Sequence, residues 1–192
     1  MEKGKVKPNF KLVVIGGSAG SLEVLLGILP RLNPMPNHAV VIVLHRKTSE
    51  DSTLEELLAL KSSIPLVDVE DKTMLTAGSI FVAPSGYHLL FEKNGELSLD
   101  ASEKIHYSRP SIDVAFESAS EAFGQNTTAI LLSGANADGA AGVQVVKQAG
   151  GIIVVQDPET AEMPYMPASA IEKIIPDYIY KPQQLLEFIN SL

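Results

Sequence analysis

The chain alternates short, continuous apolar runs with segments whose apolar residues recur at helical spacing. The apolar runs are rich in Val and Ile and occupy residues 11–15, 39–44, 127–133 and 151–156. Runs of this kind are typical of strands that are buried on both faces of a parallel sheet. We therefore predict a buried strand at each of the four positions.

Helices are predicted between and after these strands. Pro182 and the segment that follows it predict a final helix, and Ser52 with Glu55 has the spacing of a capping box ahead of another helix. Three further segments carry an apolar stripe along one helix face: Leu22, Leu25, Leu26 and Leu29; Ile112, Ala115, Phe116, Ala119 and Phe123; and Val143, Val146 and Ala149 before Gly150.

Residues 88–100 interrupt the alternation, because Asn94-Gly95 lies among apolar residues there and predicts a β-hairpin. The whole pattern predicts an α/β fold: a doubly wound, mostly parallel sheet with helices on both faces and a small antiparallel hairpin excursion. We expect residues 1–10 to form an N-terminal extension and residues 11–192 to form a single domain.

Composition and charge narrow the classes of function. The chain has 192 residues, 45% of them hydrophobic, as in an ordinary globular protein. Its formal net charge of −8 opposes a phosphate backbone, so we expect no nucleic-acid binding. With no cysteine, disulfides and thiolate chemistry are excluded. No apolar run reaches the length of a membrane-spanning helix, so we expect a cytoplasmic protein without stable membrane insertion.

The end of the first predicted strand carries a candidate nucleophile. Residues 16–20, GGSAG, match the pattern G-x-S-x-G, in which small neighbours allow a sharp turn that exposes the hydroxyl of Ser18. The dinucleotide-binding pattern G-x-G-x-x-G fails at Ser18. The next strand ends in His45-Arg46-Lys47, without the acidic residue that binds the ribose of NAD. A basic strand end suits NADP, so a Rossmann-like NADP-binding protein stays open, as does a helix-capping role for Ser18.

Two further strand ends supply a base and a carboxylate. His45 directly follows the second strand, and imidazole is the usual general base near neutral pH. Asp138 follows the third strand in a segment rich in Gly and Ala, where it could orient an imidazole or cap the next helix. If the three strands are neighbours, Ser18, His45 and Asp138 face one crevice. The sequence therefore predicts a Ser-His-Asp triad.

Seven segments of the chain together resemble the catalytic domain of the CheB-type protein-glutamate methylesterases of bacterial chemotaxis. They are VVIGGSAGSLEVL, VIVLH, VAPSGYHL, RPSIDVAFES, LLSGANADGAAG, VVQDPETA and MPASA. The resemblance implies that Ser18 is the nucleophile, His45 the base and Asp138 the third member of the triad. It also implies hydrolysis of glutamate methyl esters on methyl-accepting chemotaxis receptors and deamidation of receptor glutamines, without a cofactor or a metal.

The chain departs from this family pattern beside the site and at its N-terminus. The family usually has Thr-Gly-Gly after its serine, where this chain has Ala19-Gly20-Ser21, and it commonly has a methionine at the position of Ala135. We expect the backbone N–H groups of Ala19 and Ala135 to stabilise the oxyanion. Ten residues precede the first predicted strand, so we expect no phosphorylation-receiver domain.

Arg109, Arg46 and Met166 are the predicted substrate-binding residues. Arg109 precedes Pro110 and a predicted helix start, and a cation beside a helix N-terminus favours anions such as receptor carboxylates. We expect Arg46 to contribute to the same site. Met166 lies in a Pro-rich loop that could line a groove for a receptor helix. A catalytically silent module that docks a receptor in the same crevice stays open as a second alternative.

Overall fold

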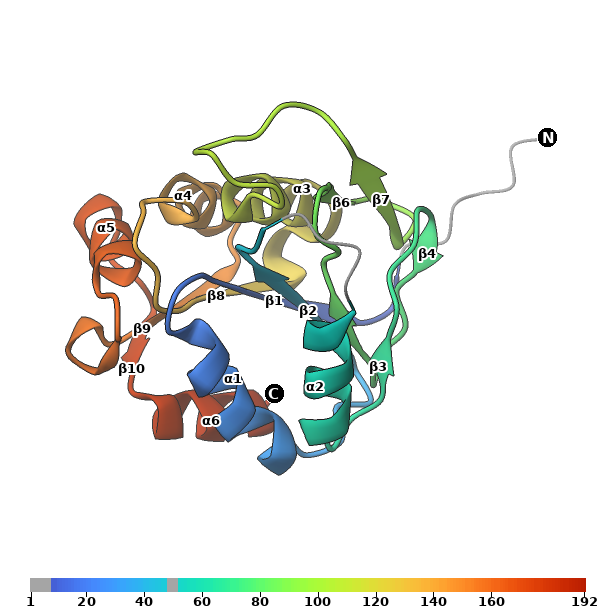
Figure 1. The fold of residues 1–192 in the computed structure, drawn as a ribbon, viewed down its shortest axis with the longest axis horizontal. Coiled ribbons are helices and arrows are strands. Elements are labelled where there is room, and N and C mark those ends of the chain that lie inside the picture. Colours follow the sequence, from blue (N-terminus) through green and yellow to red (C-terminus); the bar gives the residue numbers. More distant parts are fainter. Residues whose placement is uncertain (1–7, 48–51) are drawn as a thin grey trace.

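The computed structural model describes residues 8–47 and 52–192. Seven strands of this part of the chain form the main sheet: β1 (Lys11–Gly17), β2 (His38–Leu44), β3 (Leu66–Val67), β5 (Ile80–Val82), β8 (Thr127–Leu131), β9 (Ile152–Gln156) and β10 (Tyr178–Tyr180). Their order is β10-β9-β8-β1-β2-β5-β3, and the sheet crosses the middle of the molecule (Figure 1). All neighbouring strands in it are parallel, which confirms the predicted parallel sheet.

A second sheet of the described residues is antiparallel and contains the predicted hairpin. Its strands β6 (His88–Phe91) and β7 (Glu96–Asp100) are joined through Asn94-Gly95, where Gly95 has a φ of 86°. A short strand that the sequence did not predict, β4 (Thr73–Met74), pairs with the other edge of β7.

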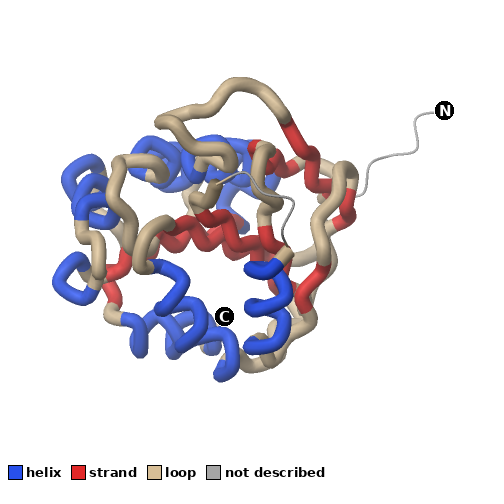
Figure 2. The backbone as a smooth tube through the Cα atoms, viewed as in Figure 1, coloured by secondary structure: helices blue, strands red, loops and turns tan. Residues whose placement is uncertain are grey.

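Helices cover both faces of the main sheet, so the doubly wound arrangement is confirmed (Figures 1 and 2). One face carries α1 (Ser21–Ile28), α2 (Thr53–Lys61) and α6 (Pro182–Asn190), and the other carries α3 (Ile112–Phe123), α4 (Ala140–Gln148) and α5 (Tyr165–Lys173). Ala149, predicted at the end of an apolar stripe, lies beyond α4 and is exposed. Short 3₁₀ helices occupy Leu29–Arg31, Gly124–Asn126 and Pro158–Thr160.

The central strand β1 shows why continuous apolar runs become the middle of this sheet. Its side chains point alternately to the two faces. Leu12 and Val14 join the core under α3, α4 and α5, while Val13 and Ile15 join the core under α1, α2 and α6. All four are at most 2% exposed, and burying each such side chain contributes about 1.5–3 kcal/mol.

Helix α2 forms without the predicted capping box. Ser52 is its N-cap residue, but the side chain caps no backbone N–H; Ser52 Oγ donates to Glu56 Oε1 at 2.6 Å instead. Glu55 forms an ion pair with Arg46, because a carboxylate is held more strongly by a forked guanidinium than by an exposed N–H. The capping-box prediction was therefore wrong.

The strand order creates a switch point at the carboxyl edge of the sheet. From β1 the chain passes to β2 on one side, and it later returns as β8 on the other side of β1. Open α/β sheets bind ligands in the crevice at such a point, beyond the carboxyl ends of the strands. The segments that follow β1, β2 and β8 all leave the sheet at this edge.

Candidate active site

Ser18 and His45 leave the sheet side by side. Gly17 and Leu44, the last residues of β1 and β2, are in register, and the N–H of His45 donates to Gly17 O at 3.1 Å. Gly20 then turns the chain into α1 with a φ of 81°, a left-handed value that favours glycine. The structure thus places the backbones of the predicted nucleophile and base next to each other.

The segment after β8 runs against Ser18 from the other side. The N–H of Ser18 donates to Ser133 O at 2.8 Å, and a Cβ atom added at Gly134 would lie 3.0 Å from Ser18 Cβ. Ser18 does not cap α1, because Gly20 is the N-cap residue of that helix. Within the described part of the chain, Ser18 Oγ makes no hydrogen bond, so the hydroxyl is available to a ligand.

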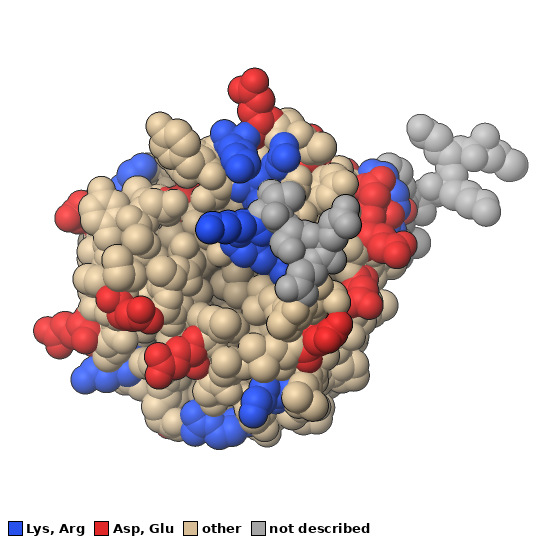
Figure 3. Space-filling view, viewed as in Figure 1, with Lys and Arg blue, Asp and Glu red and all other residues tan. Residues whose placement is uncertain are grey.

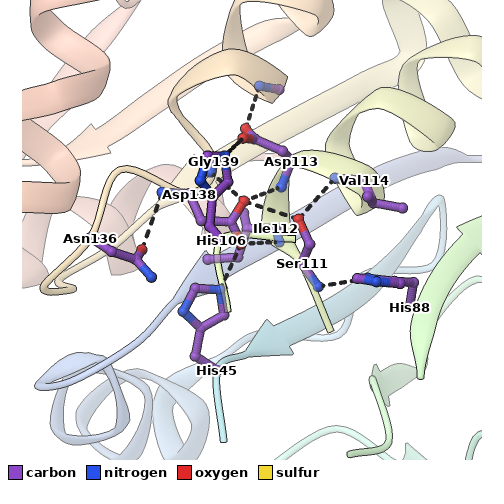
Figure 4. Close-up of polar contacts among 11 residues, drawn as sticks. His45, His88, His106, Ser111, Ile112, Asp113, Val114, Asn136, Asp138 and Gly139 are labelled. Atoms are coloured by element: carbon purple, nitrogen blue, oxygen red, sulfur yellow. Dashed lines mark hydrogen bonds and ion pairs between the residues drawn. The ribbon is translucent and has the colours of Figure 1, made fainter. Parts of the chain in front are cut away.

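His45 is bound to Asp138 through a short hydrogen bond. Its Nε2 lies 2.7 Å from Asp138 Oδ2, and the ring is directed at the carboxylate (Figure 4). Asp138 is completely buried, and the His45 side chain is 9% exposed. An ionised carboxylate can only accept hydrogen bonds, so Nε2 carries the proton in this pair. The lone pair of Nδ1 is therefore left to take up a proton.

The N-terminus of α3 holds the Asp138 carboxylate in place. The N–H groups of Ile112 and Asp113 donate to it at 2.7 and 2.9 Å, and Ser111 Oγ donates at 3.0 Å. Asp138 therefore caps α3 and not α4, the helix that follows it, where Gly139 is the N-cap residue. Burial, the largest influence, raises the pKa of Asp138, but the hydrogen bonds from His45 and from the backbone outweigh it and lower the pKa below its usual value.

Sequence reasoning missed the residues at the start of α3 that surround the Asp138 carboxylate. Ser111 and Asp113 lie in the segment RPSIDVAFES, in which the sequence assigns a role at the site to Arg109 alone. The N–H of Ser111 donates to His88 Nδ1 at 3.1 Å, and His88 Nε2 in turn donates to Glu103 O at 2.9 Å. A Ser one residue ahead of a helix and an acidic residue in its first turn are a signal of a helix start. Nothing local indicates that the same helix start holds Asp138.

The two predicted oxyanion donors lie on the segments that flank Ser18. Within the described residues, the N–H groups of Ala19 and Ala135 have no hydrogen-bond acceptor. Gly134, next to Ala135, is fixed at both of its backbone groups: its N–H donates to Met163 O at 3.0 Å, and its O accepts from Met166 N–H at 2.9 Å. These contacts hold the Ala135 loop rigidly beside the strand end.

Met166 occupies a different place from the one predicted. Its side chain is completely buried, and a Cβ atom added at Gly134 would lie 2.5 Å from Met166 Cε. It therefore packs behind the Gly134 loop and offers no surface to a substrate, which corrects the predicted contact. In the segment that leads into α5, the exposed apolar side chains are those of Met163 and of Tyr165, the first residue of that helix, which are 37% and 60% exposed.

The two predicted substrate arginines make internal contacts. The Arg46 guanidinium pairs with Glu55 and donates to Ala83 O at 3.2 Å. Arg109 Nη1 donates to two carbonyl oxygens of the β7–α3 loop, at residues 101 and 102, at 2.6 Å each. The Nε atoms of Arg46 and Arg109 are buried without a hydrogen-bond partner in the described residues. Arg46 thus binds α2 through Glu55, whereas Arg109 anchors the loop that leads into α3.

Two other properties of the described residues bear on the class of site. They contain no group of three or more His, Cys, Asp or Glu side chains placed to hold a metal ion. Among their helices, none is long and apolar enough to cross a membrane.

The chain matches known proteins over most of its length. A family model described as CheB methylesterase matches residues 13–189. The chain is 34% identical over 189 residues to the protein-glutamate methylesterase/protein-glutamine glutaminase of Thermotoga maritima, which covers 93% of this chain and 54% of that protein. It is 40% identical over 184 residues to a Leptospira interrogans protein whose name gives the same two activities, which covers 96% of this chain and 95% of that protein.

The fold comparison agrees with the sequence comparison. The crystal structure of the Thermotoga maritima CheB methylesterase catalytic domain is similar to this chain with a TM-score of 0.89 and 32% sequence identity. The similarity covers 95% of this chain and 98% of that one. The order of the strands, the site at their carboxyl edge and these matches lead to one conclusion: the chain belongs to the CheB methylesterase family.

Proposed function

We propose that this chain hydrolyses glutamate methyl esters on methyl-accepting chemotaxis receptors and deamidates receptor glutamines, with Ser18, His45 and Asp138 as its triad. The observation that supports this most directly is the 2.7 Å hydrogen bond between His45 and a buried, ionised Asp138, at the strand end beside Ser18. Residues 11–192 act as one catalytic domain in the cytoplasm, without a cofactor or a metal.

The first half of the reaction forms an acyl-enzyme. Ser18 Oγ attacks the ester carbonyl carbon while His45 Nδ1 takes the hydroxyl proton, and Asp138 stabilises the imidazolium through Nε2. His45 then gives this proton to the departing methoxide, which leaves as methanol. The hydrogen bond between Ser18 Oγ and Nδ1 forms when substrate fills the site, since such bonds commonly tighten in the Michaelis complex.

The second half returns the enzyme to its starting state. Water attacks the acyl-enzyme while His45 Nδ1 takes one of its protons, and the proton then passes to Ser18 Oγ as the glutamate carboxyl group is released. With a glutamine substrate the same steps release ammonia in place of methanol. The N–H groups of Ala19 and Ala135 donate to the negative oxygen of each tetrahedral intermediate, which is usually the largest electrostatic contribution to such catalysis.

The surface around the site suits an acidic receptor segment. Figure 3 shows several Lys and Arg side chains gathered next to a hollow on this face of the molecule. Arg109 positions the substrate at this surface, since two of its donors hold the β7–α3 loop while the guanidinium keeps its positive charge. Arg46 adds little to this surface, because the Glu55 carboxylate binds its forked donors and offsets its charge.

Methanol release from methylated receptor in membranes tests the proposal. The wild-type chain is expected to release methanol, and Ser18→Ala to lose nearly all of this activity because no nucleophile is left. Ser191→Ala is the matched control, since among the described residues Ser191 Oγ hydrogen-bonds only to Phe188 O, at the end of α6. An organophosphonate probe that labels Ser18 would distinguish an activated serine from a silent docking module. Equal methanol release by Ser18→Ala and the wild type would exclude the proposed nucleophile.

A further inference from the structure

The helices α3 and α4 exchange carboxylates at their N-termini. Asp138, which precedes α4, accepts hydrogen bonds from the first N–H groups of α3. In return, Asp113 in the first turn of α3 accepts a 2.6 Å hydrogen bond from the N–H of Gly142 in the first turn of α4. Gly139, the N-cap residue of α4, has no side chain to serve this purpose. Each helix start is thus completed by an aspartate from the other (Figure 4).

Both carboxylates of this exchange are removed from water. Asp113 is 6% exposed and Asp138 is completely buried. Two further titratable groups face the pair: His106 Nε2, from the β7–α3 loop, lies 3.7 Å from Asp113 Oδ2, and His45 binds Asp138 on its other side. The chain therefore holds two neighbouring acids and two imidazoles in one connected cluster. Of these four groups, the proposed triad contains only His45 and Asp138.

The pKa values of the two aspartates are shifted in opposite directions. Burial, and then the negative charge of Asp138, raise the pKa of Asp113 to about 6. The pKa of Asp138 is lowered by its hydrogen bonds, as described above. Two close carboxylates commonly separate in this way, since both cannot be charged without cost. A proton that enters the pair near neutral pH therefore resides on Asp113.

We propose that Asp113 is a positioning residue of the reaction, which fixes Asp138 between the two helix starts and controls how strongly Asp138 supports His45. This inference rests on the proposed function of the triad. Ionised Asp113 places a second negative charge behind Asp138, and this favours the imidazolium form of His45 that arises when Ser18 loses its proton. Protonated Asp113 removes that charge and donates a hydrogen bond to Asp138, which weakens the hold of Asp138 on His45.

Asp113→Asn separates this role from a purely structural one. The amide oxygen can still accept from Gly142 N–H, and the buried charge is gone, so the melting temperature at about pH 8 is expected to equal or exceed that of the wild type. The rate at which an organophosphonate labels Ser18 is nevertheless expected to fall about tenfold. Removal of a residue that orients a metal ligand in a metalloenzyme commonly costs a similar factor. Asp113→Glu, which restores the charge, is expected to recover part of the rate.

Asp177→Asn is the matched control. Its carboxylate likewise accepts from a backbone N–H, that of Ile153 at 2.8 Å. This contact lies at the amino ends of β9 and β10, away from the carboxyl edge that carries the site. This variant is expected to label at the wild-type rate. Asp113→Asn that labels as fast as the wild type would overturn the proposal. A slower Asp113→Asn whose melting temperature falls in parallel, and which Asp113→Glu does not rescue, would overturn it as well.

Carboxyl ¹³C and imidazole ¹⁵N NMR test the same coupling without any turnover. The Asp113 carboxyl signal is expected to titrate near the raised pKa of about 6, and the His45 ring signals to shift with it. His45 signals at about pH 8 that are identical in the wild type and in Asp113→Asn would contradict the proposal. Failure of the wild type to label at Ser18 would instead refute the proposed nucleophile, and the NMR result would still decide the role of Asp113.

Discussion

Asp138→Asn is the sharpest test of the proposed triad, because it replaces one carboxylate oxygen by an NH₂ donor with almost no change in size. Oδ2 accepts from His45 Nε2 and from Ile112 N–H, whereas Oδ1 accepts from two backbone N–H groups and a hydroxyl. An NH₂ group in the place of Oδ1 would face two backbone N–H donors with no acceptor between them. In the place of Oδ2 it would face only one such donor, the N–H of Ile112. The amide is therefore expected to turn its NH₂ toward His45.

The expected loss follows from this orientation. Opposite an NH₂ group, His45 Nε2 must accept, so the ring proton moves to Nδ1, the atom that has to take the proton of Ser18. The same substitution in a serine protease, which also leaves the wrong tautomer, lowers kcat about 10⁴-fold. The unpaired N–H of Ile112 costs about 1–3 kcal/mol of folding free energy. The variant is expected to fold but to be almost inactive.

Methanol release from methylated receptor measures the first effect, and urea unfolding measures the second. Asp177→Asn serves as the control for loss of a carboxylate that accepts a backbone N–H away from the site. A folded Asp138→Asn whose kcat lies within about tenfold of the wild type would refute the argument, because the wrong tautomer would then carry no catalytic penalty.

Three other predictions follow from the contacts. Arg109→Ala is expected to raise KM for methylated receptor with little change in kcat, and a selective fall in kcat would contradict a positioning role. Gly142→Ala is expected to destabilise by about 1–3 kcal/mol, because the added methyl would lie 2.7 Å from Phe116 Cβ and 3.0 Å from Asp113 Cα; an unchanged urea midpoint would contradict this. The pKa of Asp113 is raised to about 6 in the folded protein. At a pH below the pKa of this group in the unfolded chain, its protonation stabilises the fold, and this contribution is lost as the pH rises to about 6. The stability of Asp113→Asn relative to the wild type should therefore increase over that interval, and a constant difference would contradict the assigned pKa.

The sequence predicted those parts of the fold that carry a strong periodic signal. The four apolar runs became β1, β2, β8 and β9, because strands buried on both faces are mostly apolar, although His38, Thr127, Thr128 and Gln156 are buried in them as well. The strands of two or three residues, β3, β4, β5 and β10, went unpredicted. Two or three residues are too few to show an alternation of apolar and polar positions. The strand β10 is in addition an exposed edge strand, which is held by its pairing with β9.

The sequence could indicate the candidate site only as far as the site depends on strand ends. Ser18, His45 and Asp138 could be named because parallel strands end at one edge of the sheet. The partners of Asp138 lie 25–27 residues earlier in the chain and act partly through backbone N–H groups, which every non-proline residue carries. The burial of Met166 depends on the space left at Gly134, and Glu55 meets Arg46 only after α2 has packed on the sheet. Such contacts belong to the tertiary structure and leave no local signature.

The central position of β1 determines how this protein loses activity under stress. Amides in the innermost strands of a sheet commonly exchange with solvent only when the whole domain unfolds, and Ser18 is attached to β1, the middle strand of the described sheet. Local fraying at β3 or β10 would leave the proposed nucleophile and base in place. During heating or denaturation, the fraction of molecules that a serine probe can label should therefore report the fraction that remains folded.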